Sequence, residues 1–221
     1  MKVIVTGATG TAGRGIVKAC LEDDRITEVI ILTRRAVSGS VESHPKVQVV
    51  MHHDFSQYPD NLMDKLAGAE ACLWAIGGTV TQFNGDKEAC RRVGVTYTMA
   101  AARAMQARLA SHLPATQGKF RFVFCSGKFS EWNRTKPLFF MADSRRIKGE
   151  IEQELCGLGD AHAANFQMIG GLYQGIGTDQ LGRAMVRLAV EGYKDRIVPN
   201  ETLIKLGSAK KIKSARSSQQ S

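Results

Sequence analysis

Short apolar runs alternate with longer amphipathic stretches along most of the chain. The runs fall at 2–6, 29–32, 47–51, 71–76, 120–125 and 164–169. Runs of consecutive apolar residues, in contrast to alternating apolar and polar residues, are typical of parallel strands that are covered on both faces. The pattern therefore predicts six strands in a mostly parallel sheet.

Helical spacing fills the intervals between these runs. In the first interval the apolar residues share one face of a helix at the offsets that 3.6 residues per turn requires; they are Ile16, Val17, Cys20 and Leu21. Further helices are predicted at about 60–68, 85–110, 138–156 and 179–191. The longest of them carries an apolar stripe that consists of Ala89, Val93, Tyr97, Ala100 and Ala104.

Repeated alternation of strand and helix defines the expected fold class. A strand, a helix and a second parallel strand are joined by right-handed crossovers, which place helices on both faces of the sheet. The sequence thus predicts an α/β fold, a doubly wound (Rossmann) and mostly parallel sheet of about six strands. We expect a single domain over 1–207, including a small C-terminal substrate region, and a basic, disordered tail over 208–221.

Composition and charge limit the classes of partner. The chain has 221 residues and contains no apolar run long enough to span a membrane, nor a cleavable hydrophobic segment after Met1. We therefore expect a cytoplasmic protein without a membrane partner. The formal net charge is +9, and several of the cations follow Glu201 without an intervening acid. That tail has no aromatic residues, so we expect no specific nucleic-acid partner.

The five cysteines give no sign of a disulfide framework. Their number is odd, and no two of them stand in a C-x-x-C motif. Disulfide-rich domains and structural zinc sites need pairs at short, regular spacings. We therefore expect reduced thiols, most of them buried.

A glycine-rich segment, Thr6–Gly13 (TGATGTAG), lies between the first strand and the first helix. In such a turn the first glycine allows the sharp bend, the second lets backbone approach a pyrophosphate, and the third lets the helix pack closely on the sheet. The helix N-terminus then offers N–H groups and a positive dipole end to phosphate. The residues predicted to bind a dinucleotide here are Gly7, Thr9, Gly10, Thr11, Ala12 and Gly13.

The end of the second strand predicts which dinucleotide is bound. An acid at this place accepts hydrogen bonds from the ribose 2′-hydroxyl of NAD, whereas arginine pairs with the 2′-phosphate of NADP. The chain has Arg34 and Arg35 there. This predicts NADP(H) as the cofactor, with NAD(H) less favoured; a solvated loop face is the alternative explanation for the two arginines.

After the third strand the chain reads His52-His53-Asp54-Phe55. Asp54 is a candidate to accept a hydrogen bond from the adenine amino group, and Phe55 is a candidate to line the adenine pocket. Neighbouring residues on a strand point to opposite faces, so His52 and His53 are badly placed to share one metal ion. We therefore expect no metal site.

With the glycine-rich segment, Arg34 and Asp54-Phe55, the chain resembles the atypical short-chain dehydrogenase/reductases over about residues 1–200. The NmrA-like proteins and the Tat-interacting-protein-like reductases form the most similar group. Later landmarks of the resemblance are Leu73–Gly78, Phe124–Gly127 and Arg146–Glu150. The resemblance implies an NAD(P)-binding Rossmann domain in which Ala75, Ile76 and Gly77 also contact the cofactor.

Reductases of this family use a serine, a tyrosine, a lysine four residues after the tyrosine and often an asparagine. The resemblance implies that Ser126 is the serine and that Lys148 is the lysine, which also holds the nicotinamide ribose. The tyrosine position is occupied by Ser144, and Gly94 stands at the asparagine position. A third departure is Ile169-Gly170-Gly171, where family members commonly have Arg-Pro-Gly.

Other residues are candidates for the missing proton donor. Tyr173 follows the sixth strand on the edge of the sheet where ligands bind, and we take it as the third catalytic candidate. Tyr97 is another, although its stripe position favours a core role. Further candidates, each also explained as a solvated loop residue, are Lys128, Glu131 and Asp143. The segments 130–140 and 172–178 are interpreted either as lids over a ligand, or as packing loops or half of a dimer contact.

The leading functional hypothesis is an NADP(H)-dependent oxidoreductase that acts on a small organic carbonyl or alcohol with a degenerate Tyr-x-x-x-Lys motif. One alternative is a non-redox enzyme on the same fold, such as a cyclase, isomerase or lyase. Another is a non-catalytic NADP-binding regulator of the NmrA-like type. The sequence leaves open whether the chain is an enzyme and whether it is a monomer or a homodimer.

Overall fold

The computed structural model describes residues 1–114, 116, 118–127, 129–158, 164–169 and 176–208. These residues form one sheet of seven parallel strands in the order β3-β2-β1-β4-β5-β6-β7. The strands are β1 Lys2–Thr6, β2 Glu28–Thr33, β3 Val47–Met51, β4 Ala71–Trp74, β5 Phe120–Cys125, β6 Ala164–Ile169 and β7 Ile197–Val198. All six predicted strands are present, and the fold class is confirmed. The additional strand, β7, was not predicted, because its two residues are too few to form a recognisable apolar run.

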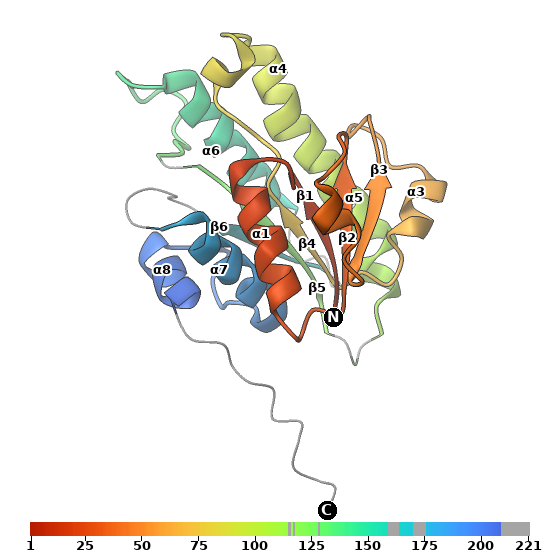
Figure 1. Ribbon diagram of the computed structural model, residues 1–221. Helices are drawn as coiled ribbons and strands as arrows, with labels where there is room; N and C mark the ends of the chain where they lie inside the picture. Colours follow the sequence, from red (N-terminus) through yellow and green to blue (C-terminus); the bar gives the residue numbers. More distant parts are fainter. Residues whose placement is uncertain (115, 117, 128, 159–163, 170–175, 209–221) are drawn as a thin grey trace, which may run out of the picture.

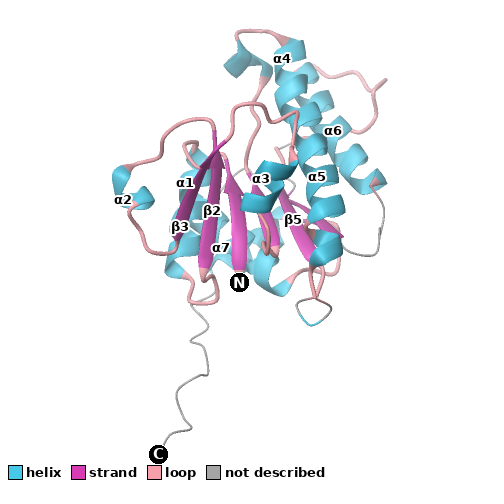
Figure 2. Cartoon of the chain, turned by 90° about the vertical axis from the view of Figure 1, so that its right-hand side faces the viewer, coloured by secondary structure: helices cyan, strands magenta, loops and turns pink. Residues whose placement is uncertain are grey.

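Helices cover both faces of the sheet (Figures 1 and 2). They are α1 Thr11–Glu22, α2 Gly39–Glu42, α3 Asp60–Lys65, α4 Lys87–Arg91, α5 Tyr97–Arg108, α6 Ala142–Gly157, α7 Thr178–Glu191 and α8 Asn200–Ser208. Helices α1, α7 and α8 pack on one face, and α3 to α6 pack on the other. The strand order reverses between β1 and β4, and open α/β sheets bind their ligands at such a point, beyond the carboxyl ends of the strands.

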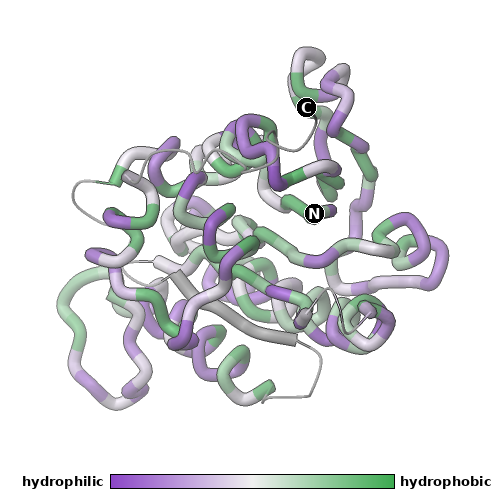
Figure 3. The backbone as a smooth tube through the Cα atoms, turned by 90° about the horizontal axis from the view of Figure 1, so that it is seen from below, coloured by the Kyte–Doolittle hydropathy of each residue, from purple (hydrophilic) through white to green (hydrophobic). Residues whose placement is uncertain are grey.

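The core consists of two apolar layers, one on each side of the sheet. Successive residues of a strand point to opposite faces, so Ile4 joins the layer under α3 to α6, whereas Val3 and Val5 join the layer under α1 and α7. In Figure 3 the helices alternate between hydrophobic and hydrophilic positions along each turn. Full burial of one aliphatic side chain contributes roughly 1.5–3 kcal/mol to the stability of the fold. These two layers therefore stabilise the sheet whose carboxyl edge would bind a ligand.

The predicted helix over 85–110 is interrupted by a π-helical turn, η2 Arg92–Thr96, between α4 and α5. The inserted residue rotates the following turns. As a result the predicted stripe of Ala89, Val93, Tyr97, Ala100 and Ala104 lies half-buried at the border of the helix face. The fully buried residues are neighbours of that stripe, such as Val95, Met99 and Met105. Regular periodicity does not reveal a π turn, so the sequence did not predict which residues of α5 are the most buried.

Several predicted boundaries shift for local reasons. Strand β4 ends at Trp74 and not at 76, because the N–H of Ala75 donates to the hydroxyl of Thr6 on the neighbouring strand, at 3.2 Å. Helix α6 begins at Ala142 and not near 138, since Met141 has a left-handed backbone with φ of 48°.

At the C-terminal end, α8 is a helix that the sequence did not predict. It ends at Ser208, so the predicted tail begins with the last helical residue. The rest of that tail, 209–221, lies outside the described residues. Within the described residues no helix is both long and apolar enough to cross a membrane.

Candidate functional site

The glycine-rich turn folds tightly between β1 and α1. Gly7 has φ of 67°, in the left-handed region that favours glycine, and a Cβ on it would lie 2.4 Å from the carbonyl oxygen of Ala75. A Cβ on Gly13 would lie 1.9 Å from the carbonyl oxygen of Gly7. The N–H of Gly10 donates to the same oxygen at 2.9 Å. Gly7 and Gly13 are thus required by close backbone packing.

Gly10 is the residue that leaves the turn open to a ligand. It precedes the twelve-residue helix α1 with extended backbone, and no side chain caps the helix. Thr11 and Ala12 are the first residues of α1 and are exposed or half-buried. Backbone N–H groups at an uncapped helix N-terminus bind phosphate. The turn therefore fits a pyrophosphate beside Gly10.

A cleft of about 170 Å³ lies at the carboxyl ends of β1, β2 and β4. It brings together nine of the residues predicted to bind the cofactor: Gly7, Thr9, Gly10, Arg34, Arg35, Phe55, Ala75, Ile76 and Gly77. The sequence reasoning did not predict five other lining residues, which are Leu32, Thr33, Phe83, Val93 and Tyr97. Leu32 and Thr33 directly precede the two arginines, and this position in the sequence could have identified them as lining residues. The remaining three come from η1 Val80–Phe83, η2 and α5 through the tertiary fold.

The two arginines after β2 differ in their contacts. The guanidinium group of Arg35 donates to the hydroxyl of Thr9 in the glycine-rich turn at 2.9 Å. The Thr33 hydroxyl donates to the carbonyl oxygen of Arg35 at 2.8 Å and so fixes the backbone of this corner. Arg34 is exposed at the rim of the cleft. The guanidinium group of Arg35 thus borders the glycine-rich turn, and Arg34 lines the same cleft.

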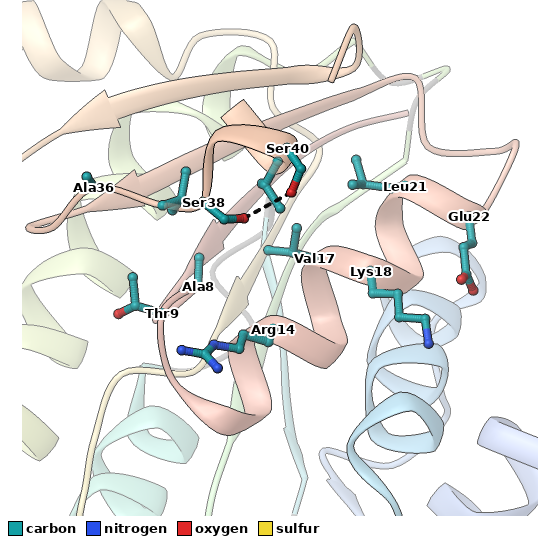
Figure 4. Close-up of a pocket in the computed structure, with 12 residues that line it drawn as sticks. Ala8, Thr9, Arg14, Val17, Lys18, Leu21, Glu22, Ala36, Ser38 and Ser40 are labelled. Atoms are coloured by element: carbon teal, nitrogen blue, oxygen red, sulfur yellow. Dashed lines mark hydrogen bonds between the residues drawn. The ribbon is translucent and has the colours of Figure 1, made fainter. Parts of the chain in front are cut away.

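A larger groove of about 710 Å³ adjoins the cleft at Thr9 (Figure 4). Its walls come from α1 and from the segment 36–41, and apolar side chains such as Val17 and Val37 line it. Arg14 extends from α1 toward the Thr9 end of this groove. The sequence reasoning missed Arg14, although its position immediately after Gly13 was a usable signal.

The two residues predicted to contact adenine lie differently from each other. Phe55 lines the cleft but is buried at 1% exposure, with its ring 6.0 Å from that of Trp74. Asp54 is exposed and accepts the N–H of Ser56 at 2.9 Å. Hydrogen bonds from the Ser56 side chain and backbone lower the pKa of Asp54. His52 packs its ring against Phe55, at 5.1 Å between centroids.

The predicted catalytic serine, Ser126, is bound to a buried carboxylate. Its hydroxyl donates to Oε1 of Glu152 at 2.5 Å, and Nε1 of Trp132 donates to Oε2 at 2.7 Å. Ser126 and Glu152 are each only 3% exposed. The sequence reasoning missed Glu152, although it stands four residues after Lys148 and therefore on the same helix face. These contacts tie β5, α6 and the segment around Trp132 together.

Lys148 reaches from α6 to the edge of the cleft. Its Nζ lies 3.0 Å from where a Cβ on Gly77 would be, and its stem packs against Gly127. The ammonium group lies 5.6 Å from the centroid of the Phe124 ring. Burial lowers the pKa of Lys148, and this effect is opposed by Cys125, Cys90 and, least, Glu152. The structure thus places this predicted residue directly beside the predicted Gly77.

The residue at the motif tyrosine position has a structural contact. Ser144 is 6% exposed, and its Oγ accepts the N–H of Val80 at 2.9 Å. This bond fixes the turn η1 against α6. Gly94, at the asparagine position, is buried in the π turn, where a Cβ would lie 3.5 Å from Cγ2 of Ile147. Both departures from the family motif therefore fill packed positions.

Of the other candidate proton donors, two are ion-paired, Tyr97 lines the cleft, and two lie outside the described residues. Glu131 pairs with Lys136 at 2.8 Å, and that hydrogen bond lowers the pKa of Glu131. Asp143 pairs with Lys87 at 2.9 Å. The ring of Tyr97 packs 6.3 Å from that of Phe55. Tyr173 and Lys128 lie outside the described residues.

The segment that precedes α6 is closely attached to that helix. The N–H of Glu131 donates to the carbonyl oxygen of Arg145 at 3.0 Å. A Cβ on Gly149 would lie 2.0 Å from the carbonyl oxygen of Glu131. These contacts favour the packing interpretation for 131–132. The second candidate lid lies mostly outside the described residues.

Comparison with protein families gives a match over residues 7–154 to a family described as NAD(P)H-binding. Among curated proteins, the chain is 36% identical over 77 residues to leucinostatins biosynthesis cluster protein T of Purpureocillium lilacinum. That match covers 35% of this chain and spans 28% of the length of the relative.

Solved structures with a similar fold include short-chain oxidoreductases and a sugar-nucleotide enzyme. A metagenomic short-chain oxidoreductase in complex with NADP has a TM-score of 0.64 and 15% identity, covering 90% of this chain and 96% of its own. The Pseudomonas aeruginosa RhlG/NADP complex has a TM-score of 0.63 and 15% identity, covering 92% of this chain and 96% of its own. DesIV, a dTDP-glucose 4,6-dehydratase from Streptomyces venezuelae with NAD and TYD bound, has a TM-score of 0.65 and 15% identity, covering 90% of this chain and 75% of its own. At these identities the likeness shows a shared fold.

Proposed function

Because the chain belongs to the NAD(P)H-binding family, we propose that it is an NADP(H)-dependent oxidoreductase of the atypical short-chain dehydrogenase/reductase type. Its substrate is a small organic carbonyl or alcohol. The observation that carries the proposal is the contact between Arg35 and Thr9, which joins a guanidinium group to the turn that fits a pyrophosphate. A 2′-phosphate on the adenosine ribose adds negative charge at this corner of the cleft.

The phosphate end of the cleft provides the binding energy in this proposal. The open backbone at Gly10 and the start of α1 bind the pyrophosphate. Arg34 and Arg35 from the β2 end, and Arg14 from α1, surround the Thr9 corner and can pair with the 2′-phosphate. Arginine forms bidentate bonds with phosphate, so each such contact favours NADP over NAD.

At the other end of the cleft, residues that follow β4 and β5 and residues of α6 form the reactive part of the site. Bound NADPH would supply a hydride to a carbonyl carbon. Lys148 places its ammonium group at Gly77, where it can bind the ribose hydroxyls of a cofactor or an oxygen of a substrate. Ser126, Glu152 and Trp132 form a buried polar group that fixes the end of β5 next to this ammonium.

A non-redox enzyme or a non-catalytic NADP-binding regulator is the second candidate. The observation that favours it is Ser144, which stands at the tyrosine position and is used to hold Val80. Turnover separates these candidates, because binding of the cofactor is common to all of them.

A calorimetric titration with NADPH and NADH tests the proposal. We expect NADPH to bind at least about tenfold more tightly, the equivalent of about 1.4 kcal/mol, because of pairing with the 2′-phosphate. Adenosine fragments with and without the 2′-phosphate should reproduce this ratio. Equal affinities would contradict the NADP assignment, and failure of both dinucleotides to bind would contradict the function as a whole.

A further inference from the structure

The serine hydroxyls at the reactive end of the cleft already have partners in the protein. Ser126 donates its proton to Glu152, and Ser144 accepts the N–H of Val80. A hydroxyl that donates its one proton to a carboxylate can only accept a hydrogen bond from a ligand. Ser144 keeps its own proton, but it is 6% exposed and is not among the residues that line the cleft. Neither serine is placed to give a proton to a ligand oxygen.

Lys148 differs from these serines because it has no carboxylate within ion-pair distance among the described residues. Its Nζ lies beside Gly77, a residue that lines the cleft, and faces the ring of Phe124. The thiols of Cys90 from α4 and Cys125 from β5 lie near enough to affect its pKa. Burial raises the pKa of Cys125 to about 11 and raises that of Cys90, so both thiols stay neutral near pH 7.

Glu152 is the carboxylate on the same face of α6, one turn beyond Lys148. Its two oxygens accept from Ser126 and Trp132. Glu152 therefore acts on Lys148 through space, as a nearby negative charge, and does not hold the ammonium group in a direct pair. The ammonium protons remain available to a ligand beside Gly77.

We propose that Lys148 is the proton donor of this site, and that its ammonium group replaces the phenol absent at position 144. This inference rests on the function proposed above. In reduction, the N–H bond at Nζ breaks and the proton bonds to the carbonyl oxygen, while the carbonyl carbon gains the hydride supplied by NADPH. The neutral amine then takes a proton from water. In oxidation of the alcohol, the neutral amine takes the hydroxyl proton.

The rates of reduction and of oxidation are expected to change with pH in opposite senses. Burial disfavours the charged amine and lowers the pKa of Lys148, and Cys125, Cys90 and Glu152 oppose this effect only in their ionised forms. Reduction needs the ammonium form, so its rate falls as the pH rises through this lowered pKa. Oxidation needs the amine, so its rate increases over the same range.

The first test measures the titration of Lys148 in the full chain without cofactor. Competitive acetylation over a pH series, resolved by mass spectrometry, reports the fraction of neutral amine at each lysine. The exposed Lys65 serves as the internal reference in the same sample. We expect the labelling midpoint of Lys148 to lie below that of Lys65. A midpoint equal to that of Lys65 would overturn the proposal.

The second test separates proton donation from positive charge. Arginine keeps the charge but does not release a proton in proteins, whereas methionine removes both. We expect Lys148→Arg to bind NADPH within about threefold of the wild type and to reduce phenanthrenequinone at least about a hundredfold more slowly. Lys148→Met should also lose NADPH affinity. Ser144→Ala, as the control, should keep wild-type turnover.

The outcomes distinguish this inference from the proposed function. Failure of the wild type to bind NADPH contradicts the proposed function. If NADPH binds and Lys148→Arg turns over phenanthrenequinone like the wild type, the proton-donor role is wrong and the proposed function stands. Absence of turnover by the wild type with NADPH bound also overturns the role. Should Lys148→Arg fail to fold, the labelling midpoint still decides.

Discussion

The phosphate end and the reactive end of the cleft are built in different ways. At the phosphate end, β1, the glycine-rich turn and α1 are consecutive in sequence, and backbone groups form the site. At the reactive end, Ser126 follows β5, Lys148 and Glu152 lie on α6, and Trp132 joins them from the segment between. Backbone sites tolerate little change in glycine, whereas side-chain sites can exchange partners. The family motif is accordingly intact at the first end and altered at the second.

The largest expected effect comes from breaking the phosphate end with Gly10→Val. A Cβ there meets the carbonyl oxygen of Gly7 at 3.3 Å, and the branched side chain occupies the side open to the pyrophosphate. We expect at least about a hundredfold loss of NADPH affinity, or about 2.7 kcal/mol, with the chain still folded. Calorimetry measures the affinity, and circular dichroism measures the folding.

Gly157→Val is the matched control, since a Cβ on Gly157 meets nothing within 4 Å. It should bind NADPH like the wild type. Unchanged affinity in Gly10→Val would show that the turn is purely structural.

Charge reversal at the end of β2 tests the selection of the cofactor and leaves the glycine-rich turn intact. Arg35→Glu removes the bond to Thr9 and places a negative charge at the predicted 2′-phosphate position. We expect the preference for NADPH over NADH to fall by about tenfold or more, because the loss affects the phosphorylated cofactor alone. Competition titrations with the two cofactors measure this ratio.

The control for that variant is Arg92→Glu, an exposed arginine that does not line the cleft. It should leave the ratio unchanged. Equal losses for the two cofactors in Arg35→Glu would contradict a role for Arg35 in selecting NADP.

Trp132→Phe tests the reactive end, where the expected effect is on stability. The change removes the N–H that donates to the buried carboxylate of Glu152 at 2.7 Å. An unsatisfied buried acceptor costs roughly 1–3 kcal/mol, so the free energy of unfolding should fall by that amount. NADPH affinity should remain near the wild-type value. Urea unfolding and calorimetry measure the two quantities, and Phe140→Leu, at an exposed site, is the control.

Ser144→Ala should have the smallest effect. Loss of the hydroxyl leaves the N–H of Val80 without its acceptor, which lowers the free energy of unfolding by about 1 kcal/mol. NADPH affinity should not change, because this serine does not line the cleft. The exposed Ser43→Ala is the control in the same urea experiment. A large loss of affinity in Ser144→Ala would instead indicate that position 144 contacts the cofactor.

Prediction from sequence worked where the signal is local. The apolar runs predicted the six longer strands, and the glycine spacing predicted the turn, because each pattern is read over fewer than ten neighbouring residues. It did not predict the most buried residues after η2, since one extra residue in a π turn changes which side chains point inward. It missed Glu152 because a glutamate in a helix is ordinarily solvated, and only the partners Ser126 and Trp132 explain its burial.

By itself, the sequence determined the six longer strands, most of the helices between them, the parallel sheet and the glycine-rich turn. Hydrophobic periodicity and glycine conformation act on consecutive residues, so they can be read along the chain. The tertiary structure decided which side chains meet: Arg35 with Thr9, Ser126 with Glu152, and Lys148 with Gly77. These partners are 26 to 71 residues apart, and only the crossovers and the packing of α6 bring them within bonding or contact distance.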